Sequence, residues 1–187
     1  MTASVFLVRH GRTVLNAQDR LRGLADPLLD DVGVAQAEAV AAVLDGRDVV
    51  AVRSSPLARA MATARVIAAH FGVPADADPR FNDRDYGPWT GRERAAVVAE
   101  FGSVDAAPGV EPTAAVLARA RPALEAVRVD GHGVVVVSHD AVIRPLIGSL
   151  APGSDPEIPT GSWSQLQWDG REWVVVSAGI LPEDVTS

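Results

Sequence analysis

The stretch Val5-Phe6-Leu7-Val8-Arg9-His10-Gly11 decides the fold and indicates where the functional site lies. Its first four residues predict a short buried strand, because a continuous apolar run is typical of a strand that is covered on both faces. Gly11 favours a sharp turn directly afterwards. Arg9 and His10 therefore stand at the carboxyl end of the predicted strand, the edge of an open α/β sheet where ligands bind.

The two polar residues of this stretch suit phosphate chemistry. Arginine presents a planar fork of donors that matches phosphate oxygens. A ring nitrogen of neutral histidine can attack phosphorus or carry a proton. Taken alone, Arg9-His10-Gly11 also fits a surface turn with an incidental histidine, so the rest of the chain has to decide.

Size and composition narrow the class of protein. The chain has 187 residues, of which 48% are hydrophobic, and we expect one soluble domain over residues 1–187. A net charge of −7 argues against a nucleic-acid partner. The sequence has neither an apolar stretch long enough for a membrane nor a signal-peptide pattern, so we expect a cytoplasmic location. An anionic ligand would then have to be held by a local cluster of arginines.

Strand-like and helix-like segments alternate along the chain. The expected strands are 5–8, 49–52, 134–137 and a hairpin of 164–168 with 173–177, and the expected helices are 33–44, 57–71, 93–101, 113–127 and 141–150. Pro122 should kink or split the helix 113–127, residues 102–112 should form a loop, and the tail from Pro182 should be frayed. The order predicts a three-layer α/β sandwich, with a mainly parallel central sheet flanked by helices and an antiparallel edge hairpin near the C-terminus.

Two further polar motifs follow predicted strands. Arg59 falls in the first turn of the helix after strand 49–52, where free backbone N–H groups favour an anion, although an exposed helix arginine is the simpler alternative. His139 directly follows strand 134–137 and should reach the same sheet edge as His10. Its simpler alternative is an incidental residue in a helix cap made by Ser138 or Asp140.

A third motif is the acidic loop Asp83-Arg84-Asp85-Tyr86-Gly87-Pro88-Trp89, which alone would also fit a solvated turn. Together with the motifs above, it makes the chain resemble the histidine phosphatase family, in its phosphoglycerate-mutase-like branch. The resemblance runs from Phe6 to about Trp173. It rests on several motifs in the right order: residues 9–16, 21–23, 26–28, 33–37, 55–60, 83–87 and 138–139.

The resemblance implies roles for five catalytic residues. His10 matches the nucleophile that forms a phosphohistidine, and Arg9, Arg59 and His139 match the groups around the transferred phosphoryl. Asp83 matches the acid that protonates the leaving oxygen. Two arginines and a second histidine can neutralise the equatorial oxygens of the transition state without a metal.

The resemblance also implies a set of substrate-binding residues. They are Arg9, Asn16, Arg22, Gly23, Arg59 and His139. Asn16 matches a further contact of the phosphate pocket, and Arg22 with Gly23 aligns with a segment that touches substrate in mutases.

The chain departs from the family pattern at three positions. The acid is usually glutamate and here is Asp83, which leaves Asp85 as an alternative acid. Arg12 replaces an acidic or amide residue. Asp140 stands where glycine is typical, and its charge near the phosphate would be unfavourable unless Arg144 or the helix start offsets it.

These observations predict a metal-independent phosphomonoester phosphatase that acts on a small phosphorylated metabolite and needs no cofactor. The alternatives are a phosphoglycerate mutase and a non-catalytic module that binds a phosphorylated ligand. A metal site of His10, His139 and Asp83 is disfavoured, because the flanking arginines would repel a cation. Nothing in the sequence indicates an oligomeric state.

Overall fold

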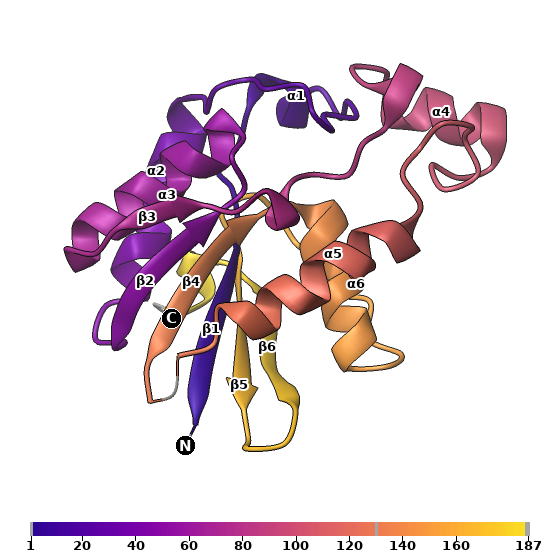
Figure 1. The fold of residues 1–187 in the computed structure, drawn as a ribbon. Coiled ribbons are helices and arrows are strands. Elements are labelled where there is room, and N and C mark those ends of the chain that lie inside the picture. The colour runs from indigo at the N-terminus through magenta and orange to yellow at the C-terminus, as the bar shows by residue number, and fades with distance from the viewer. Residues whose placement is uncertain (1, 130, 186–187) are drawn as a thin grey trace.

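The sheet is the part of the molecule that positions the site. The computed structural model describes residues 2–129 and 131–185, and its described strands form a six-stranded sheet in the order β3-β2-β4-β1-β5-β6 (Figure 1). The strands are β1 (Ala3–Arg9), β2 (Val49–Ser54), β3 (Ala75–Ala77), β4 (Gly133–Ser138), β5 (Trp163–Trp168) and β6 (Trp173–Ile180). Strands β1 to β4 run parallel to one another, β5 runs antiparallel to its neighbour β1, and β6 runs antiparallel to β5. The predicted α/β sandwich with its edge hairpin is confirmed.

Helices cover both faces of this sheet. Helices α2 (Asp31–Val43) and α3 (Ala58–Phe71) pack on one face, and α5 (Thr113–Ala126) and α6 (Asp140–Leu150) pack on the other (Figure 1). The short elements are α1 (Val14–Ala17), η1 (Pro79–Phe81), η2 (Gly87–Trp89), α4 (Arg94–Phe101) and α7 (Pro182–Val185). Within the described residues, none of the helices has the length and apolar character needed to cross a membrane.

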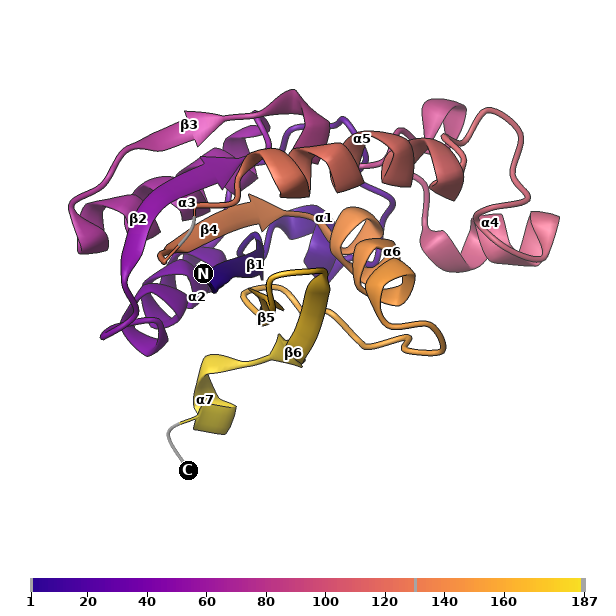
Figure 2. The same cartoon turned by 60° about the horizontal axis from the view of Figure 1, so that its bottom comes forward.

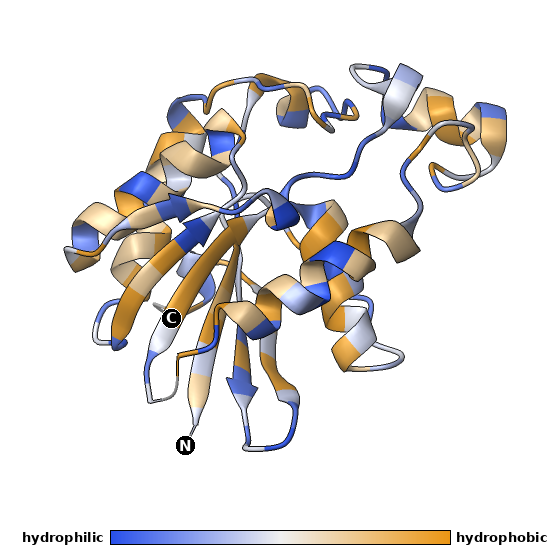
Figure 3. Ribbon diagram, in the orientation of Figure 1, coloured by the Kyte–Doolittle hydropathy of each residue, from blue (hydrophilic) through white to orange (hydrophobic). Residues whose placement is uncertain are grey.

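The two central strands explain why apolar runs marked the fold. On β1, Val5 and Leu7 enter the core under α5 and α6, whereas Phe6 and Val8 enter the core under α2 and α3. Strand β4 alternates in the same way and is buried along its whole length. Most of its ribbon has the colour of hydrophobic residues in Figure 3. Side chains of a strand point to opposite faces in turn, so a strand that is covered twice must be apolar at every position.

Several expectations about local structure need correction. Pro122 does not split α5, which runs as one helix from Thr113 to Ala126, and α6 likewise continues through Pro145. The buried side chains of each helix hold it against the sheet, which compensates for the hydrogen bond that each proline removes. The sequence patterns missed β3 and α1. Residues 182–185 are helical and not frayed, and the last two residues of the expected tail lie outside the described residues.

Residues 82–112 form a cap over one end of the sheet. Helix α4 lies within this segment and stands apart from the layers (Figure 2). The cap has its own small apolar cluster, made of Leu21, Tyr86, Val97, Val104 and Ala107. Its residues 102–112 form the predicted loop. The cap therefore packs on the loop after α1 and flanks the carboxyl edge of the sheet.

The turn after β1 is held by a close approach of two glycines. A Cβ atom added at Gly11 would stand 2.1 Å from the carbonyl oxygen of Gly33, and one added at Gly33 would stand 2.1 Å from that of Arg12. Both distances are far below van der Waals contact. Glycine at these two positions lets the turn that carries His10 rest directly on the first turn of α2.

We expect Gly33→Ala to lower the free energy of unfolding by about 2–3 kcal/mol, the upper part of the range for overpacking, because the clash is with backbone. Urea denaturation measures the change. The matched control is Gly148→Ala in α6, where the nearest atom to an added Cβ lies at 3.3 Å. A loss in Gly33→Ala no greater than in Gly148→Ala would contradict the proposed backbone clash.

Candidate active site

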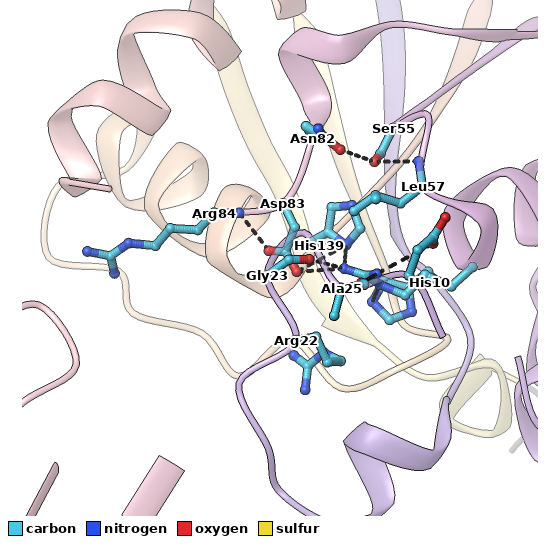
Figure 4. A network of polar contacts seen from close by, with 12 residues as sticks. His10, Arg22, Gly23, Ala25, Ser55, Leu57, Asn82, Asp83, Arg84 and His139 are labelled. Carbon is cyan, nitrogen blue, oxygen red and sulfur yellow. Dashed lines mark hydrogen bonds and ion pairs between the residues drawn. The ribbon is translucent and has the colours of Figure 1, made fainter. Parts of the chain in front are cut away.

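Four of the predicted residues meet at the carboxyl edge of the sheet. Arg9 ends β1 and His10 follows it, Arg59 lies in the first turn of α3, and His139 caps the start of α6. Strands β1, β2 and β4 are parallel neighbours, so their ends bring these side chains together. Asp83, from the segment after η1, joins them from the cap side (Figure 4).

His10 is fully buried and has a defined hydrogen-bonding state. Its Nδ1 lies 2.7 Å from the carbonyl oxygen of Gly11, which can only accept, so Nδ1 carries the proton. Its Nε2 therefore keeps a lone pair and accepts a hydrogen bond of 3.3 Å from Nε of Arg59. Burial lowers the pKa of His10 well below its ordinary value, and His139 and Arg59 add to the effect. The ring is thus neutral and nucleophilic at Nε2.

Arg59 has no exposed surface, and its guanidinium contacts His10, Asp83 and His139. Its guanidinium donates to the carbonyl oxygens of Gly23 at 2.9 Å and Ala25 at 2.7 Å. One NH2 proton goes to Oδ2 of Asp83 at 2.8 Å, which makes a buried ion pair. Burial lowers the pKa of Arg59, and Asp83 opposes that change. The group remains a cation held next to the nucleophile.

His139 completes the floor of the site. Its ring centroid lies 5.0 Å from that of His10, and its Nδ1 lies 3.4 Å from the guanidinium of Arg59. Its Nε2 is buried and has no hydrogen-bond partner among the described residues. Burial lowers the pKa of His139 well below its ordinary value, and the positive charge of Arg59 lowers it further. A neutral ring that accepts at Nδ1 has an Nε2–H free to donate to a ligand.

Arg9 and Arg22 have hydrogen-bonding capacity to spare. Arg9 donates to the carbonyl oxygen of Ile158 and Arg22 to that of Arg20, yet within the described part of the chain the buried Nε of each has no partner. Burial lowers the pKa of Arg9 to about 10, against the attraction of Asp140. The Arg9 guanidinium remains a cation at neutral pH.

Arg9 and Arg22 line a cavity of about 460 Å³. It is lined by five arginines, two aspartates and two neutral residues: Arg9, Arg12, Asn16, Asp19, Arg22, Arg94, Asp140, Arg144 and Thr160. The lining is locally positive in a chain whose net charge is −7. It therefore suits an anionic ligand better than a cation.

The remaining substrate-binding candidates lie at the edge of this arrangement. The carboxamide oxygen of Asn16 accepts from the backbone N–H and the hydroxyl of Thr13, so Asn16 caps α1 while it lines the cavity. Gly23 has a φ of +50°, and its carbonyl oxygen accepts from Arg59. It shapes the site through its backbone.

The structure separates the two candidate acids. Asp83 is 3% exposed and points into the histidine cluster, with its Oδ1 accepting from the backbone N–H of Arg84 at 2.8 Å. Asp85 is exposed, and its carboxylate accepts from the backbone N–H of Gly87 at 2.7 Å. Of the two, Asp83 alone contacts Arg59, although its catalytic role remains a prediction.

The departures from the family pattern have structural partners. Arg12 forms an ion pair of 2.9 Å with Asp30, which caps α2. Asp140 lines the cavity beside Arg144, and its attraction contributes to a raised pKa of Arg144 after the larger effect of Asp155. Arg144 is thus a neighbouring cation that attracts the Asp140 carboxylate.

Sequence reasoning missed two groups of residues around the site. Arg94 lines the cavity but stands alone in an otherwise unremarkable helix, and Arg144, considered above only as a partner of Asp140, lines it too. Thr63 accepts from the backbone N–H of Gly11 and donates to the carbonyl oxygen of Arg59. Its place one helical turn after Arg59 was an available signal. In the described part of the chain, no set of three histidine, aspartate or glutamate side chains could hold a metal ion.

Comparisons with known proteins agree with this geometry. The sequence model of the histidine phosphatase superfamily (branch 1) matches residues 5–180. A protein named probable phosphoglycerate mutase GpmB from Yersinia pestis (strain Pestoides F) is 37% identical over 83 residues. That match covers 44% of this chain and only 39% of the relative's length.

Solved structures match over nearly the whole chain. A protein titled mycobacterial hydrolase 1 is 26% identical, with a TM-score of 0.87 and coverage of 97% of this chain and 100% of its own. A mycobacterial glucosyl-3-phosphoglycerate phosphatase, in complex with VO3, is 26% identical, with a TM-score of 0.81 and coverage of 94% and 98%. A phosphoglycerate mutase from Bacillus anthracis str. Sterne, 21% identical with a TM-score of 0.88 and coverage of 99% and 96%, shares the fold.

The lowered pKa values of His10 and His139 predict a pH-dependent stability. The unfolded chain binds protons at these rings below about pH 6.5, whereas the folded protein keeps both rings neutral to lower pH. The free energy of unfolding should therefore fall as pH drops below about 6.5, by up to about 1.4 kcal/mol per pH unit for each ring. Urea denaturation at several pH values in this range should show that the free energy of unfolding depends less steeply on pH in His10→Asn and in His139→Asn than in the parent. An unchanged slope in both variants would contradict the prediction.

Proposed function

This chain belongs to the histidine phosphatase superfamily, and we propose that it is a metal-independent phosphomonoester phosphatase that acts through a phosphohistidine at His10. The observation that carries the proposal is the buried, neutral His10, whose Nε2 lone pair lies 3.3 Å from a guanidinium nitrogen of Arg59. A nucleophile beside a fixed cation is the arrangement that phosphoryl transfer needs.

The phosphate group of the substrate binds among the arginines. The Nε–H groups of Arg9 and Arg22 and the Nε2 of His139 are buried and have no partner among the described residues, and Arg59 contacts His10 directly. The charges of the arginines offset the negative charge on the equatorial oxygens as it is redistributed in the transition state, and the neutral His139 ring can donate to one of them. The arginines supply the positive charge that a metal ion provides in other phosphatases.

The reaction then takes two steps. Nε2 of His10 attacks phosphorus as the bond to the leaving oxygen breaks, and the carboxyl of Asp83 gives its proton to that oxygen. Water next attacks the phosphohistidine, passes a proton to the Asp83 carboxylate and releases inorganic phosphate, which restores His10. A bound phosphate that takes the NH2 group of Arg59 would free Asp83 from its ion pair for this role.

We favour a phosphatase over a phosphoglycerate mutase. A mutase must keep water from its phosphohistidine, which calls for a long cover over the site. The cover here is the 82–112 cap. Two of its acidic residues form ion pairs with arginines, Asp105 with Arg84 and Glu111 with Arg119. The structure that is 26% identical over 94% of this chain is titled a phosphatase, which supports the same choice. The substrate we propose is a small phosphorylated metabolite.

The first test is turnover itself. We expect the protein to hydrolyse an aryl phosphate in the presence of a chelator, and to take up acid-labile, base-stable label from a radiolabelled phosphomonoester. His10→Ala should abolish both, while His132→Ala, at an exposed histidine on the opposite edge of the sheet, should change neither.

Label that persists in His10→Ala would overturn the assignment of His10 as the nucleophile. Isomerisation of a phosphoglycerate that outpaces phosphate release would make the protein a mutase, and binding without turnover would make it a non-catalytic module.

The second test concerns the acid. Asp83→Asn should lower the single-turnover rate of phosphorylation by an alkyl phosphate by roughly 10²–10⁴-fold, the usual span for general acid catalysis. An aryl phosphate should lose much less, because a phenolate scarcely needs a proton to leave. Asp85→Asn is the matched control and should show no dependence on the leaving group. Equal losses for both substrates in Asp83→Asn would remove Asp83 from this role, and a dependence in Asp85→Asn alone would transfer the role to Asp85.

A further inference from the structure

Arg119, on α5, binds the segment that carries the candidate acid. We call residues 80–85 the acid segment. The NH1 group of Arg119 donates to the carbonyl oxygens of Arg80 at 2.9 Å and Asn82 at 2.7 Å. Its NH2 group donates to the carbonyl oxygen of Asp83 at 3.1 Å. A single guanidinium thus holds three backbone oxygens of the acid segment.

The remaining protons of Arg119 go to Glu111. Its Nε and NH2 reach the two carboxylate oxygens of Glu111 at 3.1 Å each. A guanidinium has five N–H donors, and all five are used within the protein. Arg119 and Asp83 line a second cavity, of about 570 Å³, but Arg119 has no donor left for a substrate. Its action on the reaction must therefore pass through the groups that it holds.

Glu111 binds the last residue of the acid segment, Asp85. Its carboxylate accepts from the backbone N–H of Asp85 at 3.1 Å, and its own N–H donates to the carbonyl oxygen of Asp85 at 2.8 Å. Its carbonyl oxygen accepts from Nε of Arg84 at 2.6 Å. Arg119 and Glu111 are each 22% exposed at the side chain, so the pair is largely shielded from water.

The opposite side of the acid segment is tied to the sheet. The hydroxyl of Ser55, just after β2, donates to the carboxamide oxygen of Asn82 at 3.0 Å (Figure 4). The carboxylate of Asp83 itself bonds to Arg59. The Asp83 backbone is therefore held from outside by Arg119, while its side chain faces the nucleophile. If a phosphate takes the place of Asp83 on Arg59, the carboxyl keeps the hydrogen bond from the backbone N–H of Arg84, and the outer contacts hold the backbone that carries both residues.

We propose that Arg119, with its partner Glu111, is a positioning residue that sets the place of the Asp83 carboxyl for proton transfer. The inference rests on the proposed function, in which Asp83 is the acid. Proton transfer depends steeply on placement, and a displacement of about 1 Å can cost about 10²-fold in rate. Loss of Arg119 should thus impair the protonation step while leaving the phosphate-binding groups in place.

The test compares leaving groups in single-turnover phosphorylation. In Arg119→Met we expect the rate with an alkyl phosphate to fall by about 10²-fold, and the rate with an aryl phosphate to fall much less. Arg119→Lys keeps the charge but has three donors in place of five, and should fall between Arg119→Met and the parent. Inhibition by inorganic phosphate should stay unchanged in both variants. The ratio of the two rates does not depend on how much of each preparation is folded.

The matched control is Arg121→Met, which removes an arginine from the same helix. Arg121 donates to the carbonyl oxygen of Ser149 and should leave the ratio unchanged. If Asp83→Asn changes the ratio and Arg119→Met does not, the inference is wrong and the proposed function stands. Equal losses with both substrates in Arg119→Met would show a structural role only and would also overturn it. If Asp83→Asn leaves the ratio unchanged, the acid assignment and the inference fall together.

Discussion

The buried guanidinium of Arg59 is the interaction on which the site depends. A charge without contact to water has to be paired and fully hydrogen-bonded, since an unpaired one costs several kcal/mol. Arg59 meets this demand by drawing in the carbonyl oxygens of Gly23 and Ala25, the carboxylate of Asp83 and the ring of His10. The loop after α1, the acid segment and the turn after β1 are therefore brought together by one side chain. Their mutual placement follows from its five donors.

The arginines around the site divide into two kinds. Arg59 and Arg119 have their donors engaged with the protein, and they hold loops in place. Arg9 and Arg22 keep a buried donor without a partner among the described residues. An unmade hydrogen bond at a buried donor is costly, so it marks where a ligand oxygen fits. This division explains how a chain with a net charge of −7 can present a positive pocket to an anion.

The sequence predicted the strands and most helices because burial leaves a plain pattern of apolar residues. It missed β3, which has three residues with Asp76 at its centre, since so short an edge strand needs no apolar run. It overstated the effect of Pro122, because local propensity does not include the packing of Val116, Ala120 and Leu124 against the sheet. In the candidate site, Thr63 was missed although it lies one helical turn after Arg59. Arg119 was missed because its contacts with the acid segment are to backbone oxygens, which leave no trace in residue type.

By itself the sequence determined which residues reach the carboxyl edge of the sheet. Arg9 ends a strand, His10 and His139 directly follow one, and Arg59 lies in the first turn of the helix after another. Parallel strands end at one edge whatever else the chain does. Only the tertiary structure distinguishes the surroundings of Asp83 and Asp85, which are two residues apart and chemically alike. It pairs the carboxylate of Asp83 with the buried Arg59, and it binds the backbone of Asp83 to Arg119 from the far side of the acid segment. Such contacts join residues 24 and 36 positions apart in the chain, so the fold has to form before either is defined.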